Sequence, residues 1–141
     1  MEHKVISIGK MGDFIVESEA SDGFFLKDKN SDDAVLLPNI FIQDQALEVG
    51  QEVKAFASPD SEGEMICTLR RPHACVGEYA LMSVIDNQEF GAFFDWGIEK
   101  DLLVPGNEQK DKVNLHEDHL VRVCIEEGTN RVYGTTKLGA Y

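Results

Sequence analysis

Short stretches in which hydrophobic and polar residues alternate run along the chain, and turn-forming residues separate them. In the second half this pattern predicts five β-strands, at residues 79–86, 90–96, 101–104, 120–125 and 131–137. Within residues 120–125, Val121, Val123 and Ile125 share one face, as expected of a strand with one side in a core. No segment of the sequence has a sustained helical period. We therefore predict an all-β protein.

The first half repeats this pattern more loosely. Strands are predicted at residues 13–19, 23–27, 34–37, 52–57 and 65–69, with Pro38, Pro59 and Gly63 marking turns between them. In the second half, a long polar connection over residues 106–118 separates the third strand from the fourth. Five short strands with a long connection at this point are typical of the OB-fold, a partly open Greek-key barrel.

Two parts of the chain are alike at a nearly constant offset. Gly23-Phe24-Phe25-Leu26 leads to Leu36-Leu37-Pro38, and Gly91-Ala92-Phe93-Phe94 leads to Leu103-Val104-Pro105. Pro105 lies 67 positions after Pro38, and residues 53–68 align with residues 120–135 at the same offset without a gap. This predicts two tandem five-stranded barrels. The boundary is expected near Pro72, where proline interrupts strand pairing, which gives domains at residues 1–70 and 71–141.

A family resemblance follows from the second of these segments. Phe90-Gly91-Ala92-Phe93-Phe94-Asp95-Trp96-Gly97 resembles the second-strand signature of the S-one repeats of a ribosomal protein. The whole chain, including Arg71-Pro72 and residues 76–79, is similar to the two N-terminal repeats of the conserved virulence factor B family. The resemblance implies S-one-like OB barrels in a cytoplasmic bacterial protein that binds RNA. It also implies a C-terminal winged-helix region, absent from these residues, as a candidate partner.

Strand alternation predicts which aromatic side chains of this signature face solvent. If Ala92, Phe94 and Trp96 point into the barrel, Phe93 points out, and Phe90 reaches the same outer face from just before the strand's glycine. By the resemblance, Phe90 and Phe93 match the two aromatic positions that contact RNA. In such sites aromatic rings stack on unpaired bases and cations meet phosphates.

Cationic and aromatic residues of the fourth and fifth strands complete the candidate interface. Arg131, Tyr133 and Lys137 share one face of the fifth strand, and Arg122 lies on the outer face of the fourth. The family's usual histidine after the third strand is replaced by Pro105, which removes a contact that the resemblance would imply. The predicted RNA-binding residues are Phe90, Phe93, Arg122, Arg131, Tyr133 and Lys137. Two stacking rings, at about 1–3 kcal/mol per base, predict weak and sequence-tolerant binding of single-stranded RNA.

The first half is a poorer candidate for this role. Asp22 stands at the position of Phe90 and Glu64 at that of Arg131, so only Phe25 remains in a matching outward position. Residues 1–70 contain six basic and fourteen acidic residues, whereas residues 71–141 contain seven and twelve. The first barrel is therefore expected to be degenerate, and RNA contact to centre on the second.

Acidity weighs against RNA binding in general. The chain has 13 lysines and arginines against 26 acidic residues, a formal net charge of −13. Proteins that bind phosphate backbones gain much of their affinity from basic residues that release counterions, and a negative field repels polyanions. The charge favours a second hypothesis, in which the chain is an acidic protein-interaction module that docks a basic partner or the winged-helix region.

Several of these residues could instead have purely structural roles. Phe90 and Phe93 could instead close the barrel or pack against the first unit, and Arg131 could pair with Glu127 across the turn. His116 and His119, with the two acidic residues between them, lack a third ligand of known position, so no metal site is predicted.

Other functional classes find little support in the sequence. It contains no nucleophile motif and no glycine-rich phosphate loop, so neither an enzyme nor a cofactor is expected. Cys67, Cys75 and Cys124 are odd in number and include no CxxC pair, which argues against a disulfide framework and for a reducing cytoplasm. No apolar run approaches the ~20 residues of a membrane helix, and a signal peptide is not expected.

Overall fold

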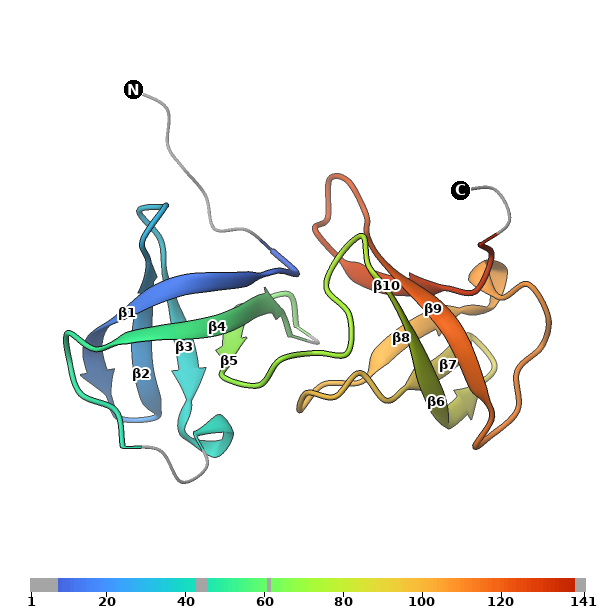
Figure 1. Cartoon of the computed structure of the whole chain (residues 1–141), viewed down its shortest axis with the longest axis horizontal. Helices are drawn as coiled ribbons and strands as arrows, with labels where there is room; N and C mark the ends of the chain where they lie inside the picture. The colour runs from blue at the N-terminus through green and yellow to red at the C-terminus, as the bar shows by residue number, and fades with distance from the viewer. Residues whose placement is uncertain (1–7, 43–45, 61, 139–141) are drawn as a thin grey trace. The chain divides into compact units, whose positions relative to one another are not determined.

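The computed structural model describes residues 8–42, 46–60 and 62–138 (Figure 1). In these residues it contains ten β-strands, two single-turn 3-10 helices and no α-helix, which confirms the predicted all-β class. The chain divides into two compact units, Met1–Arg71 and Pro72–Tyr141.

The first unit is a closed five-stranded barrel. Its elements are β1 (Met11–Ala20), β2 (Gly23–Asp28), β3 (Ala34–Pro38), the 3-10 helix η1 (Asn39–Phe41), β4 (Glu52–Pro59) and β5 (Met65–Thr68). Around the barrel the strands follow the order β1-β2-β3-β5-β4, with β4 returning to β1. The barrel closes where β3 pairs in parallel with β5 at Leu36 and Ile66. Phe14, Val16, Leu26 and Leu37 are among the buried side chains that fill it.

The second unit has the same strand order. Its elements are β6 (Tyr79–Gln88), β7 (Gly91–Phe94), β8 (Leu102–Pro105), the 3-10 helix η2 (Gly106–Glu108), β9 (Asp118–Ile125) and β10 (Val132–Thr135). They form one sheet in the order β10-β9-β6-β7-β8. Strand β10 packs closely against side chains of β8. A Cβ added at Gly134 of β10 would lie 2.9 Å from side-chain atoms of both Leu102 and Val104 in β8. The arrangement of both units confirms the OB-fold prediction.

A close approach of neighbouring strands explains the paired glycines of the two halves. Gly23 faces Pro38 in the first unit, and Gly91 faces Pro105 in the second. An added Cβ would lie 2.1 Å from a carbonyl oxygen of β3 at Gly23, and 2.7 Å from one of β8 at Gly91. Any side chain at either position would therefore clash with backbone, so glycine is the residue that fits.

The second unit's core is built around its only tryptophan. Trp96, Phe94 and Val84 are fully buried, and the Trp96 indole N–H donates a 2.8 Å hydrogen bond to the carbonyl of Ala74. The backbone N–H of His73 donates in turn to the Trp96 carbonyl at 2.8 Å. These bonds fasten the start of the unit to the segment that follows β7.

Several strand ends differ from those predicted. The turn expected at residues 87–89 begins later, because β6 pairs with β7 as far as Gln88. The β7–β8 ladder spans only Gly91 to Phe94, so Phe90 precedes the strand in which it was predicted. Likewise, Arg131 and Lys137 lie just outside β10, which pairs with β9 only from Val132 to Thr135. Pairing with a neighbour, rather than alternation, sets where each strand stops.

Candidate nucleic-acid interface

Phe90 and Phe93 form one aromatic cluster on the outside of the second unit. Phe93 lies half-buried on the outer face of β7, between the fully buried Ala92 and Phe94, as alternation predicted. Phe90 lies in the preceding turn with 61% of its surface exposed. The two ring centroids are 5.9 Å apart with an interplanar angle of 81°, an edge-to-face contact. The exposed ring of Phe90 is thus held in place by its neighbour.

Carboxylates border this cluster on one side. Asp86 of β6 is the cross-strand partner of Phe93, and Asp95 follows β7 with an exposed side chain. Burial, and next the charges of Asp95 and Asp86, raise the pKa of the Asp101 carboxyl. Asp95 and Asp86 are therefore near enough to Asp101 for their charges to repel its carboxylate, and this border is unfavourable for phosphate.

Arg122 lies in β9, between β6 and β10. It is directly opposite Tyr79 at the start of β6, and its guanidinium carbon lies 5.9 Å from the centre of the Tyr79 ring. On its other side Arg122 is the cross-strand partner of Thr135, at the end of β10 that leads to Lys137. Arg122 therefore adjoins the end of β10, and its ring contact is with Tyr79.

The remaining predicted residues, Arg131, Tyr133 and Lys137, lie in β10 or at its two ends. Tyr133 is the cross-strand partner of Cys124 on the outer face, and the two flanking cations lie at opposite ends of the strand. Among the described residues, Arg131 forms no ion pair, so the alternative pairing with Glu127 is not observed. Because β10 packs beside β8, the outer face of β10 continues the surface that carries Phe93.

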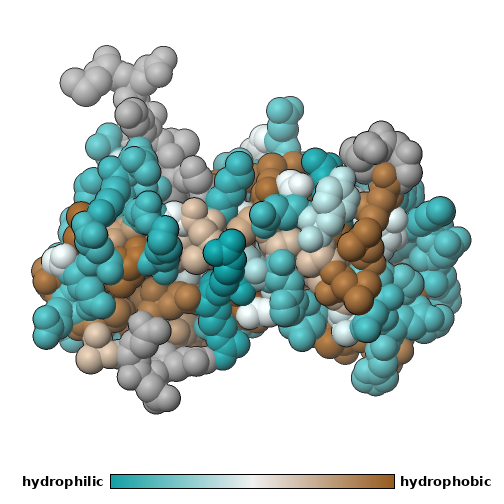
Figure 2. Space-filling model, viewed as in Figure 1, coloured by the Kyte–Doolittle hydropathy of each residue, from teal (hydrophilic) through white to brown (hydrophobic). Residues whose placement is uncertain are grey.

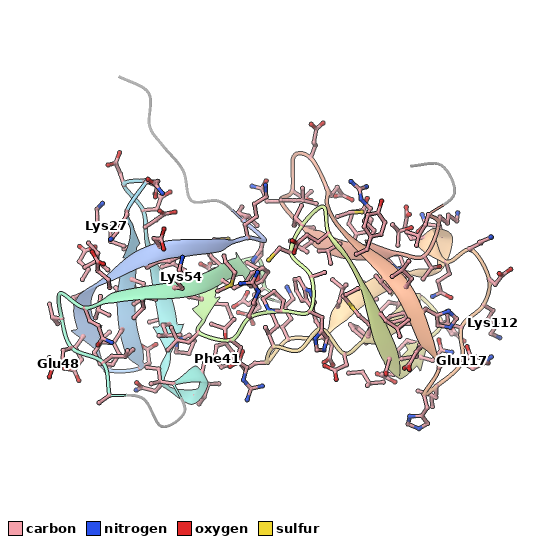
Figure 3. The ribbon with its side chains drawn as sticks, viewed as in Figure 1. Lys27, Phe41, Glu48, Lys54, Lys112 and Glu117 are labelled. Carbon is pink, nitrogen blue, oxygen red and sulfur yellow. The ribbon has the colours of Figure 1, made fainter. Side chains whose placement is uncertain are left out.

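Two lysines that the sequence did not single out lie near Lys137. The backbone N–H of Lys110 donates to the Thr136 hydroxyl at 2.9 Å, and the N–H of Thr136 donates to the Glu108 carbonyl at 3.0 Å. These bonds bring Lys110 to the residue before Lys137, and Lys112 is two positions further along (Figure 3). Lys110, Lys112 and Lys137 form no ion pair with any described side chain.

A polar pocket of about 550 Å³ opens beside Phe90. Both residues that flank Phe90 line it, and the N–H of Gly106, another lining residue, donates to the Phe90 carbonyl at 3.1 Å. Its lining is Asn87, Gln88, Glu89, Gly91, Gly106, Gln109 and Lys112. The turn before β7 and the connection after β8 together form this pocket, so residues close in sequence to Phe90 supply only part of it.

The remaining candidate groups have structural roles. The ring Nε2 of His119 lies 3.1 Å from Glu117, whose carboxyl pKa is lowered first by the backbone N–H of Asn114 and then by His119. The described residues contain no group of three or more side chains suited to a metal ion. All three cysteines are free thiols, and burial raises the pKa of Cys67 to about 12.

The described part of the chain also contains no helix long and apolar enough to span a membrane. The face shown in Figure 2 has hydrophilic and apolar areas on both units.

Comparison with known proteins relates the chain to one domain family and one group of proteins. Residues 8–70 match the family described as S1 domain, so the match covers the first unit, although the clearest strand signature lies in the second. Over 114 residues the chain is 28% identical to Conserved virulence factor B of Staphylococcus aureus strain MSSA476 and 27% identical to that of strain USA300. These alignments cover 79% of the chain and 38% of each relative.

A solved structure shares the fold. It is that of a multidomain protein with nucleic acid binding domains from Streptococcus pneumoniae, which matches 94% of this chain with a TM-score of 0.74 and 16% identity. The match covers 47% of that protein. Residues 8–70 are thus similar to S1 domains, and the chain as a whole is similar to the conserved virulence factor B proteins, the family that the sequence resemblance indicated.

Proposed function

We propose that this chain is a non-catalytic RNA-binding module whose second unit holds single-stranded RNA weakly and with little sequence preference. The observation that carries the proposal is the Phe90–Phe93 cluster, in which a largely exposed ring is fixed on the outside of an OB barrel. Such rings stack on any base. The similarity to S1 domains and to conserved virulence factor B proteins supports a cytoplasmic role within a larger bacterial post-transcriptional or virulence regulator.

The charges around the cluster give the bound strand a direction. Asp86, Asp95 and Asp101 border Phe93 and repel phosphates, whereas three lysines without ion pairs to described residues lie at the end of β10, the end nearer Phe90. We therefore expect the RNA backbone to leave Phe90 toward Lys110, Lys112 and Lys137. Arg131 and Tyr133 extend the surface along β10, and Arg122 lies opposite Thr135 beside it.

The first test removes both rings. Phe90→Ala with Phe93→Ala is expected to weaken binding of a single-stranded RNA oligonucleotide about tenfold or more, since each stacked base contributes about 1–3 kcal/mol. Fluorescence anisotropy at low salt measures the affinity. Phe25→Ala is the matched control, because Phe25 is a 38% exposed ring that faces Leu36 in the first unit as Phe93 faces Leu103 in the second. Equal affinities of the double variant and the unmodified protein would refute the proposed face.

A second candidate function is docking of a basic protein partner, such as the winged-helix region that the sequence resemblance implies. Leu81 and Leu120 are cross-strand partners on the outer face of β6 and β9, with 63% and 49% exposure, and Tyr79 beside them is 47% exposed. This apolar strip lies in a chain of net charge −13, so a partner with apolar and basic side chains is complementary to it.

This candidate is tested by changing the strip alone. Leu81→Ser with Leu120→Ser is expected to abolish capture of a basic partner from nuclease-treated lysate and to leave RNA affinity unchanged. Retention that disappears on nuclease treatment of the unmodified protein would instead identify RNA as the bridge.

A further inference from the structure

We infer that the polar pocket beside Phe90 holds one nucleobase of the bound strand and selects bases that carry an exocyclic amino group, cytosine over uracil in particular. The inference rests on the proposed function, because it concerns the nucleotide next to the one stacked on Phe90. It adds a position of base preference to an otherwise sequence-tolerant surface.

The pocket's place in the fold makes it part of the same surface. Glu89 and Gly91, which flank Phe90, line it, and Gly106 on its opposite side is bonded to the Phe90 carbonyl. Its volume of about 550 Å³ falls within the range of ligand-binding clefts. A strand that stacks one base on Phe90 therefore passes its next nucleotide over the mouth of the pocket.

Hydrogen bonds within the pocket wall determine what it presents to a ligand. The side-chain nitrogen of Asn87 donates to the Val113 carbonyl at 2.9 Å, and that of Gln109 donates to the Val104 carbonyl at 3.2 Å. The nitrogen of Gln88 donates to the Asp86 carboxylate at 3.0 Å. Each amide nitrogen thus uses at least one of its two N–H groups within the protein, whereas no amide oxygen is used in these bonds. The acceptors left for a ligand, the three amide oxygens and the carboxylate of Glu89, therefore outnumber the remaining amide N–H donors. The wall is rich in hydrogen-bond acceptors.

The hydrogen-bond acceptors of the pocket wall would recognise the exocyclic amino group of a base. Cytosine presents an amino group at the position where uracil presents a carbonyl oxygen, and adenine and guanine also carry exocyclic amines. A uracil carbonyl facing these oxygens would leave both sides without a hydrogen-bond donor, which is costly when water is displaced. Lys112, the one cation of the lining, supplies a donor for the adjoining phosphate.

Gly106 allows the pocket to be filled without disturbing the fold. A Cβ at this position would have one neighbour, the Phe90 carbonyl oxygen, at an ordinary contact distance of 3.9 Å. Gly106→Leu therefore places a side chain in the pocket, and Gly106→Ala is the matched control that leaves most of the space open. By contrast, Gly91, which also lines the pocket, accepts no side chain.

The test compares short oligocytidine with oligouridine, two pyrimidines of equal ring size, by fluorescence anisotropy. The unmodified protein and Gly106→Ala are expected to bind oligocytidine about fivefold or more tightly than oligouridine, and Gly106→Leu to reduce this ratio to about one. Equal binding of both oligonucleotides by the unmodified protein, with no effect of Gly106→Leu, would overturn the pocket and leave the stacking surface standing. Failure of every oligonucleotide to bind would refute the proposed function itself.

Discussion

Asp101 shows how the acidity of the chain acts at a single residue. Burial, and then the charges of Asp95 and Asp86, raise the pKa of its carboxyl. A raised pKa means that the folded state binds this proton more tightly than the unfolded state does. The charged carboxylate therefore costs stability once the pH rises above its folded-state pKa, and this cost is absent below the ordinary carboxyl pKa.

Replacing this carboxyl should accordingly stabilise the second unit in a pH-dependent way. We expect Asp101→Asn to raise the free energy of unfolding at neutral pH and to change it little in acid, below the ordinary carboxyl pKa. Urea denaturation at several pH values measures this, followed by the fluorescence of Trp96, the only tryptophan and a fully buried one. Asp111→Asn is an exposed control. A stabilisation that is equal at all pH values would contradict the assigned cause.

Phe90 and Phe93 show that the same residue type can be exposed for different structural reasons. Both are phenylalanines three positions apart, yet one lies in a turn and the other in a strand. Alternation predicted the outward direction of Phe93 because the inward neighbours are apolar. The exposure of Phe90 follows from the end of the β7–β8 ladder at Gly91, which is a property of the pairing.

At the scale of elements, all ten strands lie where the sequence predicted them, within a few residues at each end. Local alternation and turn residues are sufficient for this, because each short strand buries one face. The correspondence between the halves is also local. Asn39 bonds to the Asp22 carbonyl as Gly106 bonds to that of Phe90, at 2.9 and 3.1 Å. The same backbone turn therefore carries an acidic side chain in one unit and an aromatic ring in the other.

Other elements were brought together in ways that no local pattern indicates. The connection after η2 meets the end of β10 through the bond between Lys110 and Thr136, which are 26 residues apart. A Lys-Asp-Lys segment in a polar connection is not a distinctive signal in the sequence. Only this contact places Lys110 beside the residue before Lys137, with Lys112 two positions further along, and gives the candidate interface a basic end.

For the molecule as a whole, the net charge of −13 limits how RNA can be held. Long-range repulsion slows the approach of a polyanion, so binding depends on stacking and on a few local cations. The three lysines at the basic end are the cations that we expect to contact phosphates.

The affinity for single-stranded RNA should therefore depend only modestly on salt. Each neutralised phosphate contributes about −0.7 to the slope of log K against log salt, so the three lysines predict a slope of about −2. Lys112→Gln should make the slope shallower by about 0.7, whereas Lys10→Gln, an exposed lysine of the first unit, should leave it unchanged. Anisotropy titrations across a salt series measure both. An unchanged slope in Lys112→Gln would show that the strand runs elsewhere.

The sequence by itself determined the all-β class, the two similar halves, the ten strands and the outward direction of Phe93. These depend on the alternation of apolar residues and on turns, which act over a few neighbouring positions. The tertiary structure alone decided which side chains share a surface. It placed Arg122 between Tyr79 and Thr135, added Lys110 and Lys112, and formed the pocket beside Phe90. The reason is that a barrel's surface combines strands distant in the sequence, and their register depends on contacts made only on folding.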